Sequence, residues 1–458
     1  MKNNEHNLVK LIGQRILSEA NDLKRTIPAL AEELNIPQEK FKKMLSGEES
    51  IKSALNLAQL MAENYPVSLS SLLLDSDDCV NSVKIVRAKE SRKSSRIFSR
   101  KDKDGERTPY YEYRDTATSR ISPFKPEWIK ELRLVSNSDP KNPDVAYNNG
   151  HFLHQMTAFI GPVNFYWEVD GQKYCKEMKT GFSNYITPFW KHSFTTRDEK
   201  EDAIIIAVTF SGDVARARNE LYTLGNETIL SFKLDNRDKN RGTTQLIRQF
   251  LANNNLSRNS LEQVCSKNNK EINLDRLLDE KAEKSIKDLN ELSDLLGITS
   301  DNFFLPSHDE ENEVVVKEKD LNEAYIYNES NKPDYLISPL AKNPRMPLMN
   351  GFDIEIQSED CSDSGTFISS LHNFVYNYGK NPINFRWNKG SEWFDEILYP
   401  EDSIYIQPFV KHLFWNKGKN EGQIFVFRVS GSINLTVQKE LSSFASTERI
   451  IETQPWFN

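Results

Sequence analysis

Two kinds of hydrophobic pattern alternate along the chain. Near the N-terminus apolar residues such as Leu8 and Ile12 recur at helical spacing. From about residue 110 the pattern changes to short apolar runs separated by turn residues, which predict β-strands. Residues 241–306 return to the helical pattern, and residues 313–440 return to the strand pattern. We therefore expect helices, strands, helices and strands, in that order.

The first helical segment carries signals for where its helices begin and end. Thr26 can cap a helix, Pro28 suits its first turn, and Asn35 suits its exit. Further helices are predicted from Gln38 onward and over residues 55–73. Helix, tight turn and helix in this arrangement resemble the helix-turn-helix domain of repressor-like proteins.

The second half of the chain repeats the first. The segment PFWKHSF at residues 188–194 returns as PFVKHLF at residues 408–414, an offset of 220 residues, and NFYW at 164–167 returns as NFRW at 384–387. Such a repeat indicates a duplication. Many short strands at even spacing suggest a jelly-roll barrel, the cupin architecture. We predict an α+β fold: a tandem duplication of a helix-turn-helix-like helical domain followed by a cupin barrel.

The predicted domain boundaries follow these changes of pattern. The first helical domain is expected at residues 1–78 and the first barrel at residues 79–235. The second helical domain follows at residues 236–308 and the second barrel at residues 309–458. The basic, polar stretch 89–104 is expected to form an exposed connection or an edge strand.

Composition and charge narrow the class of protein. The 458 residues carry a formal net charge of −8, which argues against a nucleic-acid partner. No apolar run approaches the length of a membrane span, and the N-terminus lacks the apolar core of a signal peptide. Widely spaced cysteines with no CxxC motif predict reduced thiols in a cytoplasmic protein. They are Cys79, Cys175, Cys265 and Cys361.

The first copy contains a candidate metal site. Non-haem iron sites that activate dioxygen usually combine two His and one carboxylate. His151 and Gln155 are four residues apart, so on a strand both would point the same way and His154 the opposite way. His192 would lie on a later strand. The third ligand is open, because Ile186 stands where a carboxylate could serve, which leaves the amide oxygen of Gln155.

The second copy lacks most of this set. Its best alignment places Ser369 and Asn373 where the first copy has the upstream His and Gln, and it retains His412. A histidine shared by both copies could simply pack in both barrels. The joint loss of the other two residues favours a metal-binding first half and a scaffold second half.

These residues resemble a known family. The pattern of Asn148, His151 and Gln155, followed by His192, in a chain that joins repressor-like helical domains to cupins, is similar to the iron-dependent phosphonate oxygenases. The epoxidase branch of that family has Glu in place of Gln155, and its 2-hydroxyethylphosphonate dioxygenase branch has Glu in place of Ile186. The methylphosphonate-forming branch has Gln and Ile, as here. The resemblance covers nearly the whole chain.

The resemblance implies roles for individual residues. Asn148 would bind substrate, and the ligands of an Fe(II) cofactor would be His151, Gln155 and His192, the last also contacting substrate. Arg107 is the candidate for the family's arginine, although Lys103 competes with it. The alternative for Asn148 is a purely structural role in a turn before a strand.

Three further residues match the family's catalytic machinery. Lys24 is expected to bind substrate and act in catalysis, and its copy in the second half is Asn255. Tyr111 is expected to be catalytic and Tyr113 to bind the phosphonate. The plain alternatives are a solvated helix lysine and tyrosines that pack in the barrel.

The activity implied is conversion of 2-hydroxyethylphosphonate and O2 to methylphosphonate, with the lost carbon leaving as bicarbonate or CO2. The nearest alternative is a dioxygenase that gives hydroxymethylphosphonate and formate. A transcription regulator with a sensory cupin is the rival from another class, and a purely structural bicupin is a third option. Against the regulator, residues 38–44 are only locally basic and residues 275–280 are acidic. The expected partners are the phosphonate, O2 and further copies of the chain in a homo-oligomer.

Overall fold

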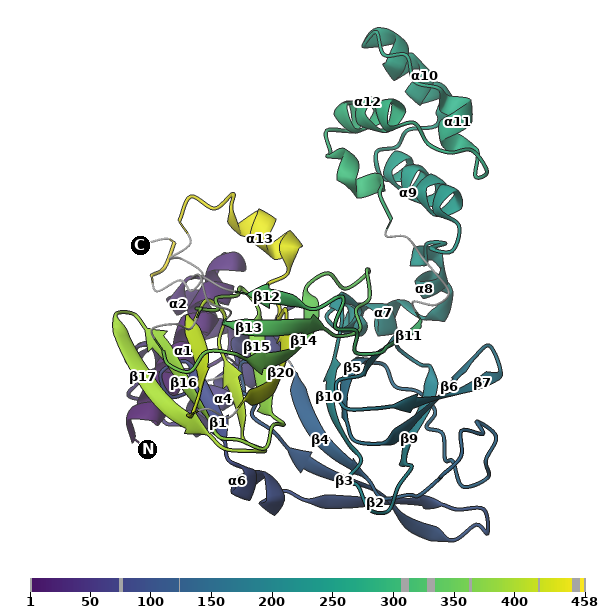
Figure 1. Ribbon diagram of the computed structural model, residues 1–458. Coiled ribbons are helices and arrows are strands. Elements are labelled where there is room, and N and C mark those ends of the chain that lie inside the picture. The colour runs from purple at the N-terminus through teal and green to yellow at the C-terminus, as the bar shows by residue number, and fades with distance from the viewer. Residues whose placement is uncertain are drawn as a thin grey trace. The chain divides into compact units, whose positions relative to one another are not determined.

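The computed structural model consists of two compact units (Figure 1). The first comprises Met1–Val80, Ser119–Ser122 and Gly431–Asn458, and the second comprises Asn81–Thr118 and Pro123–Ser430. The structure describes residues 2–73, 77–122, 124–305, 313–327, 334–361, 365–418, 421–446 and 454–456. The predicted boundary between residues 308 and 309 lies outside these ranges.

The first unit is helical. Its helices are α1 Lys2–Asp22, α2 Ile27–Glu33, α3 Gln38–Ser46, α4 Ile51–Asn64, α5 Leu69–Leu72 and α13 Leu435–Leu441. The apolar stripes of α1 to α5 meet in one core that buries Ile16, Leu30, Phe41, Leu57 and Leu72. Burial of these stripes stabilises helices that are individually short.

The helix-end signals act as predicted, with one difference. The Thr26 side chain accepts a hydrogen bond from the backbone N–H of Ala29, and Asn35 leaves the helix with φ 54°. The helix expected over residues 55–73 instead begins at Ile51 and ends at Asn64. Pro66 explains the early end, because the residue before a proline is driven out of the helical conformation.

The first barrel contains a seven-stranded sheet in the order β11-β8-β5-β10-β4-β3-β2 and a three-stranded sheet in the order β7-β6-β9. Side chains of both sheets share one core. The strands are β2 Arg96–Lys101, β3 Arg107–Asp115, β4 Lys125–Glu131, β5 His154–Ile160, β6 Val163–Val169, β7 Gln172–Met178, β8 Ser183–Ile186, β9 Lys191–Thr196, β10 Ile204–Phe210 and β11 Val314–Lys317.

The second barrel has the same topology. Its sheets run β1-β18-β15-β20-β14-β13-β12 and β17-β16-β19. The strands are β1 Val83–Val86, β12 Tyr325–Tyr327, β13 Tyr335–Pro339, β14 Met349–Ile356, β15 His372–Asn377, β16 Ile383–Lys389, β17 Glu392–Leu398, β18 Ser403–Ile406, β19 His412–Asn416 and β20 Gly422–Val429. Gln155 pairs with Ile186, and Asn373 pairs with Ile406, so the register confirms the alignment of the two copies.

The two barrels exchange one edge strand each. Strand β1 precedes the first barrel in sequence but pairs with β18 of the second, with Val83 opposite Ile406. Strand β11 precedes the second barrel but pairs with β8 of the first, with Val314 opposite Ile186. Each large sheet is therefore completed by a strand from the other half of the chain. In the stretch 89–104, a short helix, α6 Ala88–Lys93, comes before the edge strand β2.

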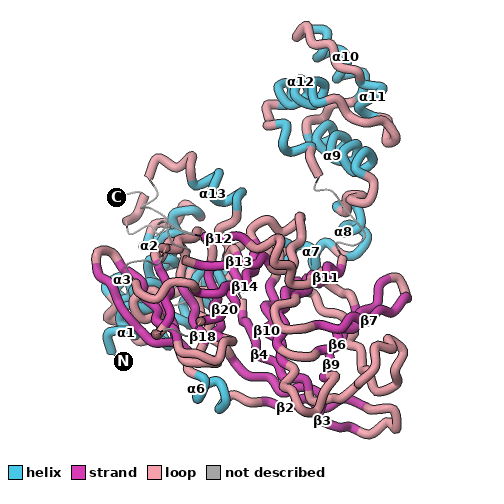
Figure 2. The backbone as a smooth tube through the Cα atoms, viewed as in Figure 1, coloured by secondary structure: helices cyan, strands magenta, loops and turns pink. Residues whose placement is uncertain are grey.

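A second helical region lies between the barrels in sequence (Figure 2). It has its own core of Ile247, Leu261, Leu292 and Phe303. Its elements are η1 Asp213–Ala215, α7 Arg218–Leu224, α8 Asn226–Phe232, α9 Lys239–Asn253, α10 Arg258–Lys267, α11 Leu274–Leu278, α12 Ile286–Leu296 and η2 Ser300–Phe303. Across the described parts of the chain, no helix combines the length and apolarity that a membrane crossing requires.

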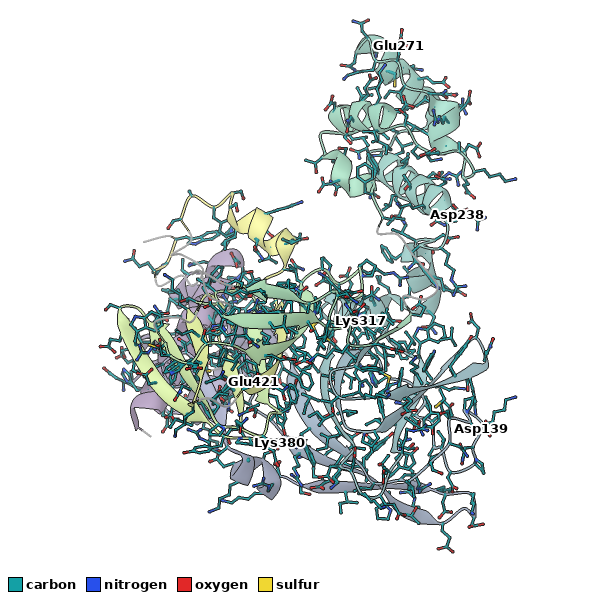
Figure 3. All side chains as sticks on the ribbon, viewed as in Figure 1. Asp139, Asp238, Glu271, Lys317, Lys380 and Glu421 are labelled. Atoms are coloured by element: carbon teal, nitrogen blue, oxygen red, sulfur yellow. The ribbon has the colours of Figure 1, made fainter. Side chains whose placement is uncertain are left out.

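Lys319, in the segment after β11, forms ion pairs with residues of β14 in the second barrel. Lys319 Nζ lies 2.8 Å from the carboxylate of buried Asp353 and 2.8 Å from that of Glu355. Lys317, labelled in Figure 3, forms a more exposed ion pair with Glu323. We expect Lys319→Ala to lower the free energy of unfolding by about 3 kcal/mol, because it leaves a buried carboxylate without its cation. Chemical denaturation measures this.

Lys317→Ala is the matched control and should cost less than about 1 kcal/mol. Burial already raises the pKa of Asp353. The deficit of Lys319→Ala should therefore be absent at a pH below the unfolded pKa of Asp353 and should grow as the pH rises. Equal losses in the two variants at neutral pH would contradict this assignment.

Candidate metal and substrate site

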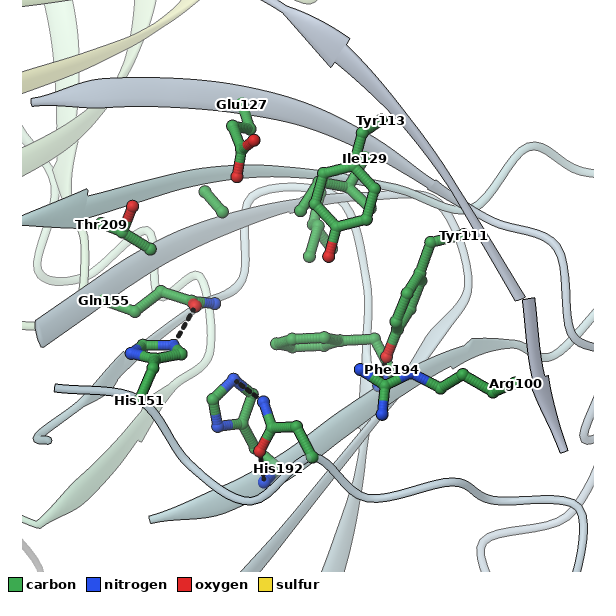
Figure 4. A pocket seen from close by; sticks show the side chains of 13 residues that line it. Arg100, Tyr111, Tyr113, Glu127, Ile129, His151, Gln155, His192, Phe194 and Thr209 are labelled. Carbon is green, nitrogen blue, oxygen red and sulfur yellow. Dashed lines mark hydrogen bonds between the residues drawn. The ribbon is translucent and has the colours of Figure 1, made fainter. Parts of the chain in front are cut away.

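A cavity of about 120 Å³ opens inside the first barrel (Figure 4). Apolar side chains of Ile129, Phe194, Ile205 and Ala207 form part of its wall. Its polar lining consists of Arg100, Tyr111, Tyr113, Glu127, Asn148, His151, Gln155, His192 and Thr209. The cavity therefore brings together most of the residues that the sequence singled out.

His192 is held by backbone on one side and faces the cavity with the other. It is the second residue of β9 and is 4% exposed. Its Nδ1 lies 2.9 Å from the carbonyl oxygen of Trp190, which can only accept, so Nδ1 carries a proton, and Nε2 is the ring atom that faces the cavity. Burial lowers the pKa of His192 to about 3, which keeps the ring neutral. A neutral imidazole with an oriented Nε2 is the form that binds metals.

His151 presents its Nε2 in the same way but not from a strand. Strand β5 begins at His154, so the expectation that His151 lies on this strand was wrong. His151 precedes the strand, and its Nδ1 lies 2.8 Å from the carbonyl oxygen of Leu153. The local turn, and not a strand, thus orients the His151 ring. His154 is turned elsewhere, with its Nδ1 3.0 Å from the hydroxyl of Tyr185.

Gln155 completes a three-donor set. Its amide nitrogen donates to Thr157 Oγ1 at 2.9 Å, so its Oε1 faces His151 Nε2 at 3.2 Å. Two acceptor atoms that face each other at this distance favour a cation between them. Donors at right angles around a metal about 2.1 Å away would lie about 3 Å apart. The rings of His151 and His192 have centroids 5.1 Å apart. This donor set fits a divalent metal.

Asn148 serves as both a turn residue and a cavity residue. Its Oδ1 accepts hydrogen bonds from the backbone N–H groups of Gly150, at 3.0 Å, and of His192, at 2.9 Å. Its amide nitrogen lies 2.9 Å from His192 Nε2. Because the oxygen is fixed by two donors, the N–H groups of the amide are directed toward the candidate metal position.

Tyr111 makes a contact that both halves of the chain share. Its hydroxyl accepts the backbone N–H of Phe194 at 3.1 Å. In the second barrel the hydroxyl of Tyr335 accepts the N–H of Phe414 at 3.0 Å. Since Phe194 and Phe414 are corresponding residues of the repeat, the contact belongs to the architecture of both barrels. It gives Tyr111 a packing role.

Tyr113 differs between the halves. It pairs with Ile129 across the sheet, and the corresponding pair in the second barrel is Ile337 with Ile354. Tyr113 points its hydroxyl into the cavity (Figure 4). Burial raises its pKa, so the hydroxyl remains a hydrogen-bond donor.

The structure places a different arginine at the cavity from the one predicted. Arg107 is exposed at the start of β3, and Lys103 is exposed in the preceding turn. Arg100 on β2 lines the cavity instead, with its guanidinium over the ring of Tyr111. The pairing of β2 with β3 shifts register after Phe98, and a bulge of this kind changes which side chains face inward. A run of mixed cations gives no sequence signal for this shift.

Two further polar residues at the cavity were missed. Glu127 and Ile129, two residues apart on β4, both face the cavity. Thr209 of β10 pairs with Gln155 of β5 and also lines it. Burial raises the pKa of Glu127. A glutamate at an inward position of a predicted strand is a signal that could have identified it.

Lys24 belongs to the first unit, whereas the cavity lies in the second. It follows α1 with φ 58°, and its counterpart Asn255 follows α9 with φ 55°. The Lys24 ammonium lies 3.9 Å from the ring centroid of Trp456. The two positions therefore correspond structurally, as the repeat predicts.

The second barrel fills the corresponding space with a fixed cation. Arg428 occupies the position of Thr209, and its Nε–H donates to Asn373 Oδ1 at 2.9 Å. The carbonyl of Ser369 accepts the backbone N–H of Phe409, as the carbonyl of His151 accepts that of Phe189 in the first barrel. His412 keeps the contact of its Nδ1 with a backbone carbonyl. A guanidinium thus stands where the first barrel offers its donor set.

Comparisons with known proteins agree with this geometry, although no family model matches the chain. The chain is 34% identical over 458 residues to methylphosphonate synthase of Nitrosopumilus maritimus (strain SCM1), covering 97% of this chain and 95% of that protein. It is similar to the structure of Streptomyces albus HEPD with 2-hydroxyethylphosphonate and Fe(II) bound, with 29% identity, a TM-score of 0.87 and coverage of 98% and 99% of the two chains. It shares the fold of native PhpD with cadmium atoms at 18% identity, a TM-score of 0.72 and coverage of 95% and 97%.

The turn between Asn148 and His151 provides a test of the site's framework. Gly150 has φ 73°, and a Cβ there would lie 2.3 Å from the carbonyl oxygen of Phe189. We expect Gly150→Ala to lower the free energy of unfolding by about 3 kcal/mol, through backbone strain and overlap. Gly171, with φ 82° and open space around it, is the matched control. Gly171→Ala should cost about 1 kcal/mol. Similar losses in chemical denaturation would show that the overlap is relieved without cost.

Proposed function

Because the chain belongs to the family of methylphosphonate synthases and related iron-dependent phosphonate oxygenases, we propose that it converts 2-hydroxyethylphosphonate and O2 to methylphosphonate, with the lost carbon leaving as bicarbonate or CO2. The observation that carries the proposal is the convergence of two histidine Nε2 atoms and Gln155 Oε1 in one cavity. Ile186, fully buried opposite Gln155, leaves no carboxylate at the alternative ligand position.

The proposed ligands of Fe(II) are His151 Nε2, Gln155 Oε1 and His192 Nε2. When bound, Fe(II) supplies the activation of dioxygen that this oxidation requires. All three ligands are neutral, so the site would keep the full charge of the ion, whereas a carboxylate ligand would reduce it. The extra positive charge favours a doubly negative phosphonate.

The substrate would be held by groups that the cavity already presents. Arg100 can form charge-assisted hydrogen bonds to phosphonate oxygens, and Tyr113 can donate its hydroxyl. Metal binding to His192 Nε2 would replace the contact between that atom and the amide of Asn148. The freed N–H of Asn148 could then donate to the substrate.

The remaining family expectations form part of the same proposal. Lys24 is proposed to contribute to substrate binding and catalysis. For Tyr111, which the resemblance made catalytic, we propose a different role: it positions β9 through Phe194, because the second barrel repeats that contact without the donor set. The finer architecture is proposed to be a tandem helix-turn-helix-like and cupin duplication, with domains at residues 1–78, 79–235, 236–308 and 309–458.

A dioxygenase that yields hydroxymethylphosphonate and formate is the second candidate. The similarity to HEPD, a 2-hydroxyethylphosphonate dioxygenase, favours this candidate, with a TM-score of 0.87. The Gln155 and Ile186 pair favours the synthase. The two reactions begin from one substrate and differ in their phosphorus-containing product, so product analysis separates them.

The decisive experiment is reconstitution of the chain with Fe(II) without oxygen, followed by 2-hydroxyethylphosphonate and O2. We expect a methylphosphonate signal in the phosphorus NMR spectrum. Gln155→Leu should lower the rate at least about 100-fold by removing a metal ligand. Gln172→Leu, on an exposed hairpin, should retain the rate. Hydroxymethylphosphonate without methylphosphonate would establish the dioxygenase, and unchanged substrate with iron bound would contradict both reactions.

The two arginines give a second test. Arg100→Gln should raise the KM for 2-hydroxyethylphosphonate by about 10- to 100-fold, which corresponds to loss of a charged hydrogen bond. Arg107→Gln, a matched change at an exposed arginine, should leave KM unchanged. Steady-state kinetics with Fe(II) measures both. A larger rise in KM for Arg107→Gln than for Arg100→Gln would show that Arg107, as the sequence predicted, binds the phosphonate.

A further inference from the structure

We propose that Glu313, which the second half of the chain contributes, is a positioning residue for the metal site of the first barrel. The proposal rests on the assignment of that metal site under the proposed function. Glu313 lies directly before β11, the exchanged strand, whose first residue Val314 pairs with Ile186 of β8.

The loop that follows β8 bonds to both the backbone and the side chain of Glu313, and within the loop the indole N–H of Trp190 also reaches Thr187 Oγ1 at 2.9 Å. Its carbonyl oxygen accepts the backbone N–H of Thr187 at 2.9 Å. Its carboxylate Oε2 accepts the Thr187 hydroxyl at 2.6 Å and the indole N–H of Trp190 at 3.0 Å. Arg345 Nη2 lies 3.6 Å from the other carboxylate oxygen. The side chain is 14% exposed, so these contacts are largely shielded from water.

The loop held by Glu313 touches both histidine ligands. The carbonyl of Trp190 accepts the Nδ1–H of His192 at 2.9 Å. One residue earlier, the N–H of Phe189 donates to the carbonyl of His151 at 2.8 Å. The anchored indole and the carbonyl that orients His192 belong to the same residue. An error in the placement of Trp190 therefore transmits directly to a ligand.

The loop that Glu313 holds contains a residue with a strained backbone. Phe189 has φ 69° and is 65% exposed, so its own side chain does little to hold this conformation. A positive φ in a bulky residue costs on the order of 1 kcal/mol or more and persists when neighbouring contacts impose it. The carboxylate of Glu313 fixes the residues on both sides of this position.

The second barrel keeps the loop and lacks the carboxylate clamp. Phe409 has φ 61°, and the N–H of Gln407 donates to the carbonyl of Ser82, so the backbone contact is repeated. All three side chains of the clamp are replaced, however. Glu313 corresponds to Ser82, Thr187 to Gln407 and Trp190 to Val410. The clamp thus occurs in the half that carries the donor set, which distinguishes it from a contact needed to build the barrel.

The test compares iron binding by full-length variants. Glu313→Ala should weaken Fe(II) binding, measured anaerobically by calorimetry, by about 10- to 100-fold, as expected for loss of support to a ligand. Glu313→Gln keeps an acceptor oxygen and should restore most of the affinity. Glu318→Ala is the control, because Glu318 lies just beyond β11 and pairs with Lys176 of the first barrel, away from the loop. Hydrogen exchange without added metal should be faster at residues 187–192 in Glu313→Ala than in the control.

A second variant approaches the same contact from the first barrel. Trp190→Phe removes the indole N–H and should weaken Fe(II) binding similarly, with an effect that does not add to that of Glu313→Ala. It carries the test if Glu313→Ala does not fold. Wild-type affinity in either folded variant, or strictly additive losses, would overturn the positioning role. Failure of the wild-type chain to bind Fe(II) would overturn the proposed function, and this role with it.

Discussion

The pairing of β8 with two neighbours is the constraint on which the site depends. Ile186 lies opposite Gln155 of β5 on one side and opposite Val314 of β11 on the other. A slip of one residue between β5 and β8 would place Gln155 and Ile186 on opposite faces of the sheet, because side chains alternate along a strand. Such a slip is costly because all four side chains of β8 are buried. The loop that follows β8 leads to His192, so the register of β8 also determines where this proposed ligand lies.

The duplication has kept this framework while its two cavities have diverged. The first retains a set of neutral donors, and the second has Arg428 bonded to Asn373. If the first cavity holds the proposed divalent ion, both cavities contain positive charge next to the corresponding residues Gln155 and Asn373. In one barrel the charge would arrive with a dissociable ion, and in the other it is covalently part of the chain. The second half can therefore keep its barrel without depending on a metal.

Sequence reasoning identified the features that depend on local pattern. The helix ends near Thr26 and Asn35, the order of helical and strand segments and the alignment of the two copies follow from periodicity and from the repeat. Features that depend on long-range register were missed. Arg100 reaches the cavity because of a bulge in β2, and β11 joins the first barrel although it lies over 100 residues away in sequence. No periodicity within a segment encodes either fact.

The exchanged strands also govern how the chain can fold as it is synthesised. The β8 edge of the first barrel remains unpaired until residues 314–317 have left the ribosome, while β1 must wait still longer for β18. An open sheet edge is a template for pairing with other chains, so the nascent first half passes through a stage prone to misassembly. The contacts that close the two sheets join residues far apart in sequence, Ile186 with Val314 and Val83 with Ile406, which predicts slow final steps. Because each barrel needs a strand from the other half of the chain, neither half can complete its sheet alone, and both sheets are completed late in folding.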